Sequence, residues 1–193
     1  MISTTTNRKL RLAIGFVLAC ALATAAGASA QTGGTPPPGS TDPAPAPAPA
    51  PVAGVATLQP DGSAIPPSDA PRQVRKAINA GNRIRTKPYL WGGGHRSFKA
   101  KGYDCSGAVS YLLHAAGMLK RPLASGPFMR WGAPGTGAWI TVYANSGHMY
   151  VVIAGLRYDT SAVGESLNQG SGPRWRSTQR ASTGYAARYL PGF

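Results

Sequence analysis

The sequence predicts an α+β domain in which an antiparallel sheet packs against a helix that carries a cysteine at its N-terminus. An apolar helical pattern over residues 108–117 directly follows Cys105. Farther along the chain, apolar runs at 139–144, 148–154 and 157–160 are separated by turn residues, which is typical of an antiparallel meander. One helix packed across such a sheet is an α+β architecture.

Two segments precede this domain. Residues 1–30 combine a basic start, an apolar run and a small-residue site, so we expect a signal peptide cleaved near Ala30. Residues 31–70 contain eleven prolines and are interpreted as a disordered Pro/Ala-rich linker. The domain should then span residues 71–193 of a secreted or cell-envelope protein without stable membrane insertion. An uncleaved anchor and lipidation at Cys20 are the alternatives.

The charge of the domain indicates the class of its binding partners. Residues 71–193 hold seventeen of the twenty Lys and Arg residues but only three of the six acidic ones. A field of that sign favours polyanions. For an exported protein we expect anionic wall polymers and not nucleic acid; a basic surface without a particular partner is the alternative.

Composition also excludes two classes of hydrolase. A conventional glycosidase needs two carboxyl groups across the scissile bond. The domain offers three in all: Asp104, Asp159 and Glu165. Two of them have better local roles. The three histidines lack the compact spacing of a zinc hydrolase, so neither a metal nor an organic cofactor is expected.

A first helix is expected at the start of the domain. Ser68 and Asp69 are suited to cap it, and apolar residues recur at helical spacing after Pro71. Gly81 is a natural stop. The chain then enters three glycines at 92–94, which are typical of backbone that passes close to another group or to a substrate.

Cys105 is the candidate nucleophile. After removal of the signal peptide it is the only cysteine left, so in an oxidising compartment it has no disulfide partner. Asp104 is placed to cap the following helix by accepting from the backbone N–H of Ser106 or Gly107. A helix N-terminus stabilises a thiolate, and its free N–H groups can receive an oxyanion.

A thiolate nucleophile also needs a base that can protonate the leaving amine, which histidine does near neutral pH. His148 opens a strand directly after a tight turn and is the preferred candidate, with His95 as the alternative. Asp159 on the neighbouring strand is expected to fix the tautomer of His148. Its competitors for that role are Thr160 and Ser161.

The rest of the domain carries weaker signals. The segments 173–176 and 185–189 are expected as edge strands of the sheet. The stretch 120–137 is rich in Gly and Pro and is expected to be a loop.

Three motifs give a family resemblance: Pro-Tyr-Leu-Trp-Gly-Gly at 88–93, Tyr-Asp-Cys-Ser-Gly at 103–107, and Gly-His at 147–148 before an apolar strand. The chain resembles the NlpC family of papain-like cell-wall cysteine peptidases, as a divergent member. The resemblance implies the papain-like fold and hydrolysis of amide bonds in peptidoglycan stem peptides. It implies Cys105 as nucleophile and His148 as general base and acid. Four residues around the thiol would bind the peptide: Tyr89, Trp91, Asp104 and Ser106.

The chain departs from the family in the hairpin around the histidine. The usual Pro-Gly-Asp-Leu entry is replaced by Pro-Gly-Thr-Gly-Ala-Trp at 134–139, and Asp159 lies eleven positions after His148 where the family's polar residue lies at about twelve. The identity of the residue that orients His148 is therefore open. Two alternatives to the peptidase stay open as well: an amidase or acyltransferase with the same dyad, and a non-catalytic basic wall-binding module. We expect a monomer.

Overall fold

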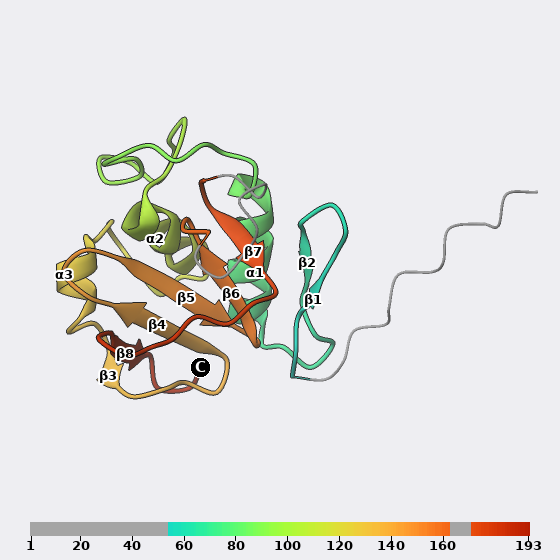
Figure 1. The fold of residues 1–193 in the computed structure, drawn as a ribbon. Coiled ribbons are helices and arrows are strands. Elements are labelled where there is room, and N and C mark those ends of the chain that lie inside the picture. Colours follow the sequence, from blue (N-terminus) through green and yellow to red (C-terminus); the bar gives the residue numbers. More distant parts are fainter. Residues whose placement is uncertain (1–53, 163–170) are drawn as a thin grey trace, which may run out of the picture. The chain divides into compact units, whose positions relative to one another are not determined.

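Two helices packed on an antiparallel sheet form the fold of the computed structural model, which describes residues 54–162 and 171–193 (Figure 1). The expected signal peptide and most of the expected linker lie outside these residues. Within them, no helix has the length and apolarity that a membrane span requires.

The sheet has six strands in the order β3-β8-β4-β5-β6-β7, and every pair is antiparallel. Its members are β3 (Ala133–Pro134), β4 (Ile140–Ala144), β5 (Met149–Ile153), β6 (Leu156–Asp159), β7 (Arg174–Arg176) and β8 (Ala186–Tyr189). The predicted meander corresponds to β4, β5 and β6. The α+β class is thus confirmed.

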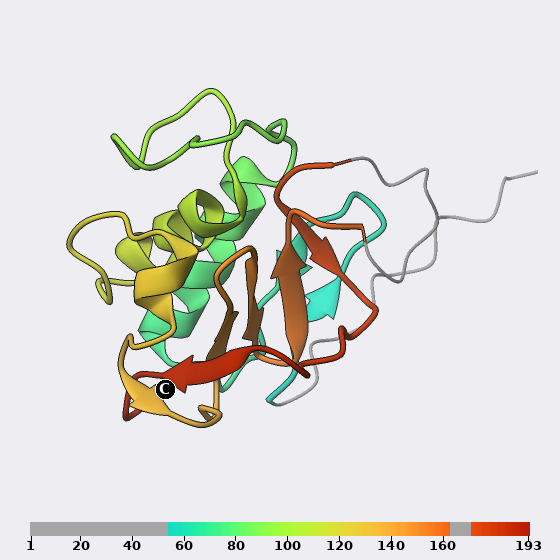
Figure 2. The same ribbon diagram turned by 60° about the vertical axis from the view of Figure 1, so that its left-hand side comes forward.

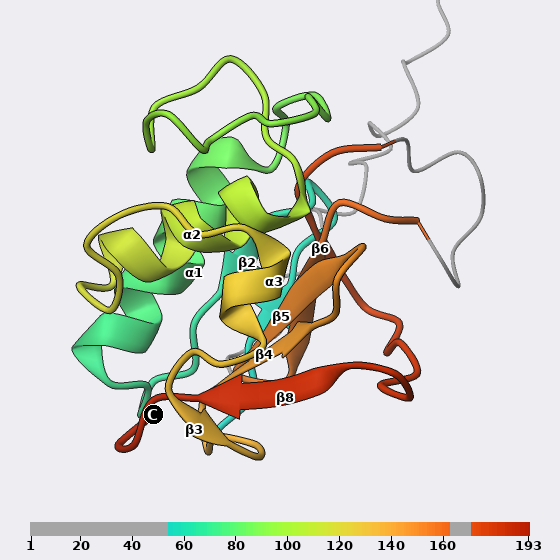
Figure 3. The ribbon, with the colours of Figure 1, turned by 90° about the vertical axis from the view of Figure 1, so that its left-hand side faces the viewer.

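One side of the sheet differs from expectation. The segment 185–189 was expected at an edge, but β8 pairs with both β4 and β3 and lies inside the sheet (Figure 3). The edge is formed by β3, which falls within the expected loop 120–137. The same stretch carries the short helix α3 (Ser125–Phe128). Short elements of this kind have too few residues to show a period in the sequence.

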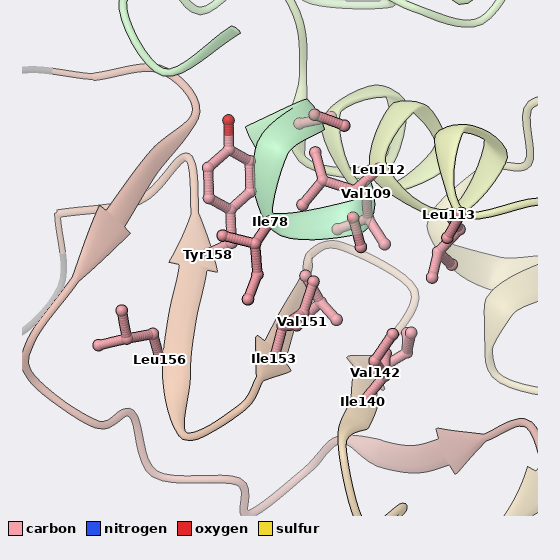
Figure 4. Close-up of a cluster of buried hydrophobic side chains, with 14 of the residues drawn as sticks. Ile78, Val109, Leu112, Leu113, Ile140, Val142, Val151, Ile153, Leu156 and Tyr158 are labelled. Carbon is pink, nitrogen blue, oxygen red and sulfur yellow. The ribbon is translucent and has the colours of Figure 1, made fainter. Parts of the chain in front are cut away.

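Helices α1 (Arg72–Ile84) and α2 (Cys105–Ala115) lie side by side and cover one face of the sheet (Figure 2). The core fills the space between the two layers (Figure 4). Ile78 of α1 and Leu112 of α2 meet Val142 and Val151 of the sheet there, and all four are fully buried. This packing fixes α2, and with it the cysteine at its start, over the strands.

Helix α1 begins and ends at other residues than predicted. Its N-cap is Pro71, whereas Asp69 accepts a hydrogen bond from the backbone N–H of Gly54. Gly81 does not end the helix; it lies inside α1, where the ring of Trp175 packs against it. A Cβ there would lie 2.6 Å from that ring. The glycine is therefore a packing requirement and not a stop signal.

The ordered domain starts before the expected boundary at residue 71. A hairpin of β1 (Thr57–Leu58) and β2 (Ala64–Ile65) packs on α1, although these residues were assigned to the linker. Asn82 binds both the N–H and the carbonyl of Ala64, each at 2.8 Å. Its Oδ1 also accepts from the indole of Trp175 at 2.9 Å. One side chain thus joins the hairpin, α1 and β7.

Candidate active site

The N-terminus of α2 carries the candidate nucleophile. Asp104 is the N-cap residue, and its Oδ1 accepts from the backbone N–H of Gly107 at 2.7 Å, which confirms the predicted cap. Cys105 follows as the first helical residue; it is a free thiol and partly exposed. At this position unpaired N–H groups and the helix dipole favour a negative charge.

The glycine loop packs directly on this helix start. Tyr89 pairs with Tyr103 in a parallel bridge, so the two segments that lead to the loop and to α2 run side by side. The carbonyl of Gly93 accepts from the N–H of Asp104 at 3.3 Å. A side chain at Gly107 would overlap that same carbonyl. This close approach of two backbones explains Gly107, whereas Gly93 is required by the carbonyl of Gly102, which would lie 2.3 Å from its Cβ.

Tyr89 and Trp91 frame the thiol from this loop. Burial raises the pKa of Tyr89, and negative charge at Cys105 and Asp104 raises it further. The phenol therefore stays protonated and offers an O–H group close to the thiol. Trp91 is 85% exposed, which leaves its indole ring open to a ligand.

His148 is positioned by a tight turn before β5. Oδ1 of Asn145 accepts from the N–H of His148 at 2.8 Å, and the N–H of Asn145 donates to the carbonyl of His148 at 2.9 Å. Strand β5 pairs with β6, which ends at Asp159. Nε2 of His148 lies 2.9 Å from Oδ1 of Asp159, and the ring and the Cys105 thiol line the same pocket.

The electrostatics of this cluster favour a charged imidazole. Burial lowers the pKa of His148, but hydrogen bonds to Asp159 and then Cys105 outweigh it and raise the pKa from 6.5 to about 9. Burial raises the pKa of Asp159, but the hydrogen bonds from His148 and from the backbone of Ser161 bring it below its usual value. An imidazolium between a carboxylate and a thiol therefore prevails at neutral pH.

Two arginines that the sequence reasoning did not single out also approach Asp159. Nη1 of Arg180 lies 3.3 Å from Oδ2, and Nε of Arg157 lies 3.8 Å from the same oxygen. Asp159 is only 2% exposed, so these charges act in a poorly solvated place. Arg157 neighbours Asp159 along β6, but Arg180 lies 21 positions later, and no local signal connects the two.

His95 is held by the two residues on either side of Cys105 in the chain, Asp104 and Ser106. The sequence offered no group to orient it, but its Nε2 lies 2.9 Å from Oδ2 of Asp104 and 3.1 Å from Oγ of Ser106. The partner is the helix cap, whose second oxygen is available for this tertiary contact. Two histidine–aspartate pairs therefore flank one thiol.

The carboxylate of Asp104 is fully engaged within the protein. Its Oδ1 accepts from Gly107 N–H and from Ser106 Oγ at 3.1 Å, while Oδ2 accepts from His95 and from Gly92 N–H at 3.1 Å. Four donors occupy the roughly four lone-pair sites of a carboxylate. A substrate group could bind Asp104 directly only by displacing one of these donors.

Asp104→Ala should consequently lower the free energy of unfolding, by about 2 kcal/mol, because it removes the cap of α2 and leaves buried N–H donors unpaired. Ser68→Ala is the matched control. Ser68 was predicted as a cap but makes no hydrogen bond within the described part of the chain, so its loss should change stability by less than about 0.5 kcal/mol. Urea unfolding of both variants is the measurement. Equal effects would contradict the assignment.

These residues line a pocket of about 310 Å³. Its lining comprises Tyr89, Trp91, Gly92, His95, Asp104, Cys105, Ser106, Ala124, Ser125, Ser146, Gly147 and His148. Six of the seven preferred candidate residues are in this wall, and so is His95, the alternative base. Asp159 lies behind His148. Across 54–162 and 171–193, no cluster of three His, Cys, Asp or Glu side chains could hold a metal ion.

A second pocket, of about 230 Å³, lies between the β1–β2 hairpin, the end of α1 and β7. Asp61, Arg85 and Trp175 are in its wall, and Arg85 is already paired with Asp61 at 2.9 Å. None of the sequence-predicted site residues lines it. The chemistry therefore belongs to the pocket at the start of α2.

Comparison with known proteins returns structural matches alone. No protein-family model and no curated protein matches the sequence. A hypothetical invasion protein of Mycobacterium tuberculosis matches with a TM-score of 0.45 and 24% identity over 62% of each chain, so more than a third of that protein has no counterpart here. The peptidoglycan hydrolase RipB of the same organism matches with a TM-score of 0.47 and 21% identity over 65% of this chain and 69% of RipB.

RipD of Mycobacterium tuberculosis matches with a TM-score of 0.46 and 20% identity, over 63% of this chain and all of RipD. It is known as a non-catalytic NlpC/p60 domain protein adapted to peptidoglycan binding. The chain is thus similar to both a hydrolase and a non-catalytic protein.

Proposed function

We propose that the protein is a secreted thiol hydrolase that cleaves amide bonds in peptidoglycan stem peptides. One observation carries the proposal. Cys105 at the start of α2 and His148 line one pocket, and Nε2 of His148 is 2.9 Å from Oδ1 of Asp159. A nucleophile, a base and an orienting carboxylate in this order form the arrangement of a cysteine hydrolase.

The reaction follows from these positions. The Cys105 thiolate attacks the carbonyl carbon of the amide, and N–H groups in the first turn of α2 receive the oxyanion. His148 gives its proton to the leaving amine as the C–N bond breaks, which leaves a thioester on Cys105. The neutral imidazole then takes a proton from water, and the hydroxide attacks the thioester. The C–S bond then breaks, which releases the acid and leaves the thiolate beside the re-formed imidazolium, the state from which the reaction began.

We assign substrate contacts to the side chains that are open to the pocket. Tyr89 supplies a protonated hydroxyl and Trp91 an exposed ring, both beside the thiol. Asp104 and Ser106 act indirectly in this proposal, because their polar atoms already bind His95 and each other. They hold the wall of the pocket in place.

The charge of the chain supports a location near wall polymers. The formal net charge is +14, yet no lysine or arginine lines the pocket. We therefore assign the basic surface to attraction of the domain to anionic wall polymers, and the pocket to the peptide. The signal peptide, monomeric state and absence of a cofactor are parts of the same proposal.

Digestion of purified sacculi or isolated muropeptides with wild type and Cys105→Ala tests the proposal by mass spectrometry. We expect new masses that correspond to a hydrolysed stem-peptide amide with wild type, and none with Cys105→Ala. A product mass that places the cut at the muramoyl–alanine bond, or one that shows acyl transfer, would replace the peptidase with those alternatives. Salt-sensitive sacculus binding by both proteins with no product would indicate a non-catalytic module.

A further inference from the structure

Asp159 uses its two oxygens for two different sets of partners. Oδ1 accepts from Nε2 of His148 at 2.9 Å and from the backbone N–H of Ser161 at 2.8 Å. Oδ2 faces the guanidinium groups of Arg180 at 3.3 Å and Arg157 at 3.8 Å. The carboxylate is thus fixed in one orientation, with one oxygen toward the histidine and the other toward two cations.

Arg180 reaches this place from the connection between β7 and β8. Its guanidinium carbon lies 5.8 Å from the ring centre of Tyr150 and 5.5 Å from that of Tyr185. The hydroxyl of Tyr150 also reaches the carbonyl of Arg180 at 3.5 Å. These aromatic rings hold Arg180 independently of Asp159, because both distances are below the 6 Å limit of a cation–π contact. The rings of Tyr150 and Tyr185 therefore fix the guanidinium group of Arg180 next to Asp159.

We propose that Arg180 is a positioning residue of the candidate active site: it holds Oδ2 of Asp159 so that Oδ1 stays on His148, and its charge limits how strongly the carboxylate retains the imidazolium. This inference rests on the proposed function. The effect of Arg180 on the His148–Asp159 pair matters for catalysis only if His148 must give its proton to a leaving group. A carboxylate paired with His148 alone would hold that proton more tightly.

The other charges around the pair do not replace Arg180. Cys105 approaches His148 from α2, and Arg157 approaches Asp159 from β6. Tyr150 of β5 faces the carboxylate with a pKa that burial, foremost, raises to about 12, so it stays neutral at physiological pH. Arg176 of β7 binds the backbone carbonyl of Asp159, with Nε at 3.4 Å, and not its carboxylate. Among these groups, Arg180 has the shortest distance from a cationic side chain other than His148 to the carboxylate.

The test is the titration of His148 in Arg180→Met, which keeps the length and apolar stem of the side chain and removes its charge. The sequence has three histidines. Their ring signals in the NMR spectrum are assigned by replacing each histidine in turn and noting which signal disappears. We expect the midpoint of His148 to rise by about one pH unit in Arg180→Met and to return to within a few tenths of wild type in Arg180→Lys. Arg130→Met, at an exposed position, is the matched control and should leave the midpoint unchanged.

A second readout separates positioning from a purely structural role. With a cleaved muropeptide as substrate, Arg180→Met should lower kcat about tenfold with KM nearly unchanged, because the loss acts on proton transfer and not on binding. An unchanged or lowered His148 midpoint in folded Arg180→Met overturns the inference. If that variant does not fold, Arg180→Gln is titrated with the same criterion. The titration needs no turnover, so it decides the inference even if the protein proves non-catalytic.

Discussion

His148→Gln should slow hydrolysis of the stem-peptide amide by about 10³-fold, measured as kcat/KM with a purified muropeptide. Glutamine can accept or donate a hydrogen bond in the same place, but it cannot carry a proton from the thiol to the leaving amine. The variant also removes the positive charge that His148, with its pKa near 9, places beside Cys105 at neutral pH. Both losses act on the transition state, so the fall should appear mainly in kcat.

The other two histidines provide controls for this prediction. His114 is exposed on α2, where its ring stacks on Phe98 at 3.7 Å, and His114→Gln should leave the rate within about twofold of wild type. His95→Gln tests the alternative base, because His95 lines the same pocket. We expect a smaller loss than for His148→Gln, since the partner of His95 is the helix cap. A larger loss for His95→Gln than for His148→Gln would assign the base to His95.

Much of the site could be predicted from the sequence because its signals are local. A capping aspartate, a lone cysteine and an apolar helical face are adjacent in the chain, and the structure has Asp104 as N-cap with Cys105 at the first position of α2. The turn before His148 and the strands after it also follow from neighbouring residues, as β4, β5 and β6 show. Asp159 was one of three options, and its placement required the register of β5 on β6.

The parts that could not be predicted depend on contacts between distant segments. The bond from His95 to Asp104 requires the glycine loop to fold onto α2, and Arg180 meets Asp159 only after β7 and β8 are in place. The hairpin before residue 71 has two residues in each strand, too few for a period, and Asn82 of α1 ties it to the domain. Such features are decided by packing and by single polar side chains, and neither of these produces a periodic pattern in the sequence.

The pH dependence of stability should reveal the His148–Asp159 pair. The pKa of His148 rises from 6.5 in a free side chain to about 9 in the folded protein. A raised pKa gives stability that is fully present below the unfolded value, near pH 6.5, and is lost as the pH rises through 9. The contribution is on the order of 3 kcal/mol. The lowered pKa of Asp159 acts in the other window: its contribution is present above about pH 4 and is lost as the pH falls below that.

The measurement is urea unfolding of wild type and His148→Gln between pH 6 and pH 10. Lysines and tyrosines titrate in both proteins, so the difference in unfolding free energy isolates His148. We expect that difference to shrink by about 3 kcal/mol over this range, and a difference that stays constant would contradict the charged pair. In a Cys105→Ala background the change should be smaller, because Cys105 contributes to the raised pKa of His148. The size of that reduction measures how strongly the thiol and the imidazole are coupled before any substrate binds.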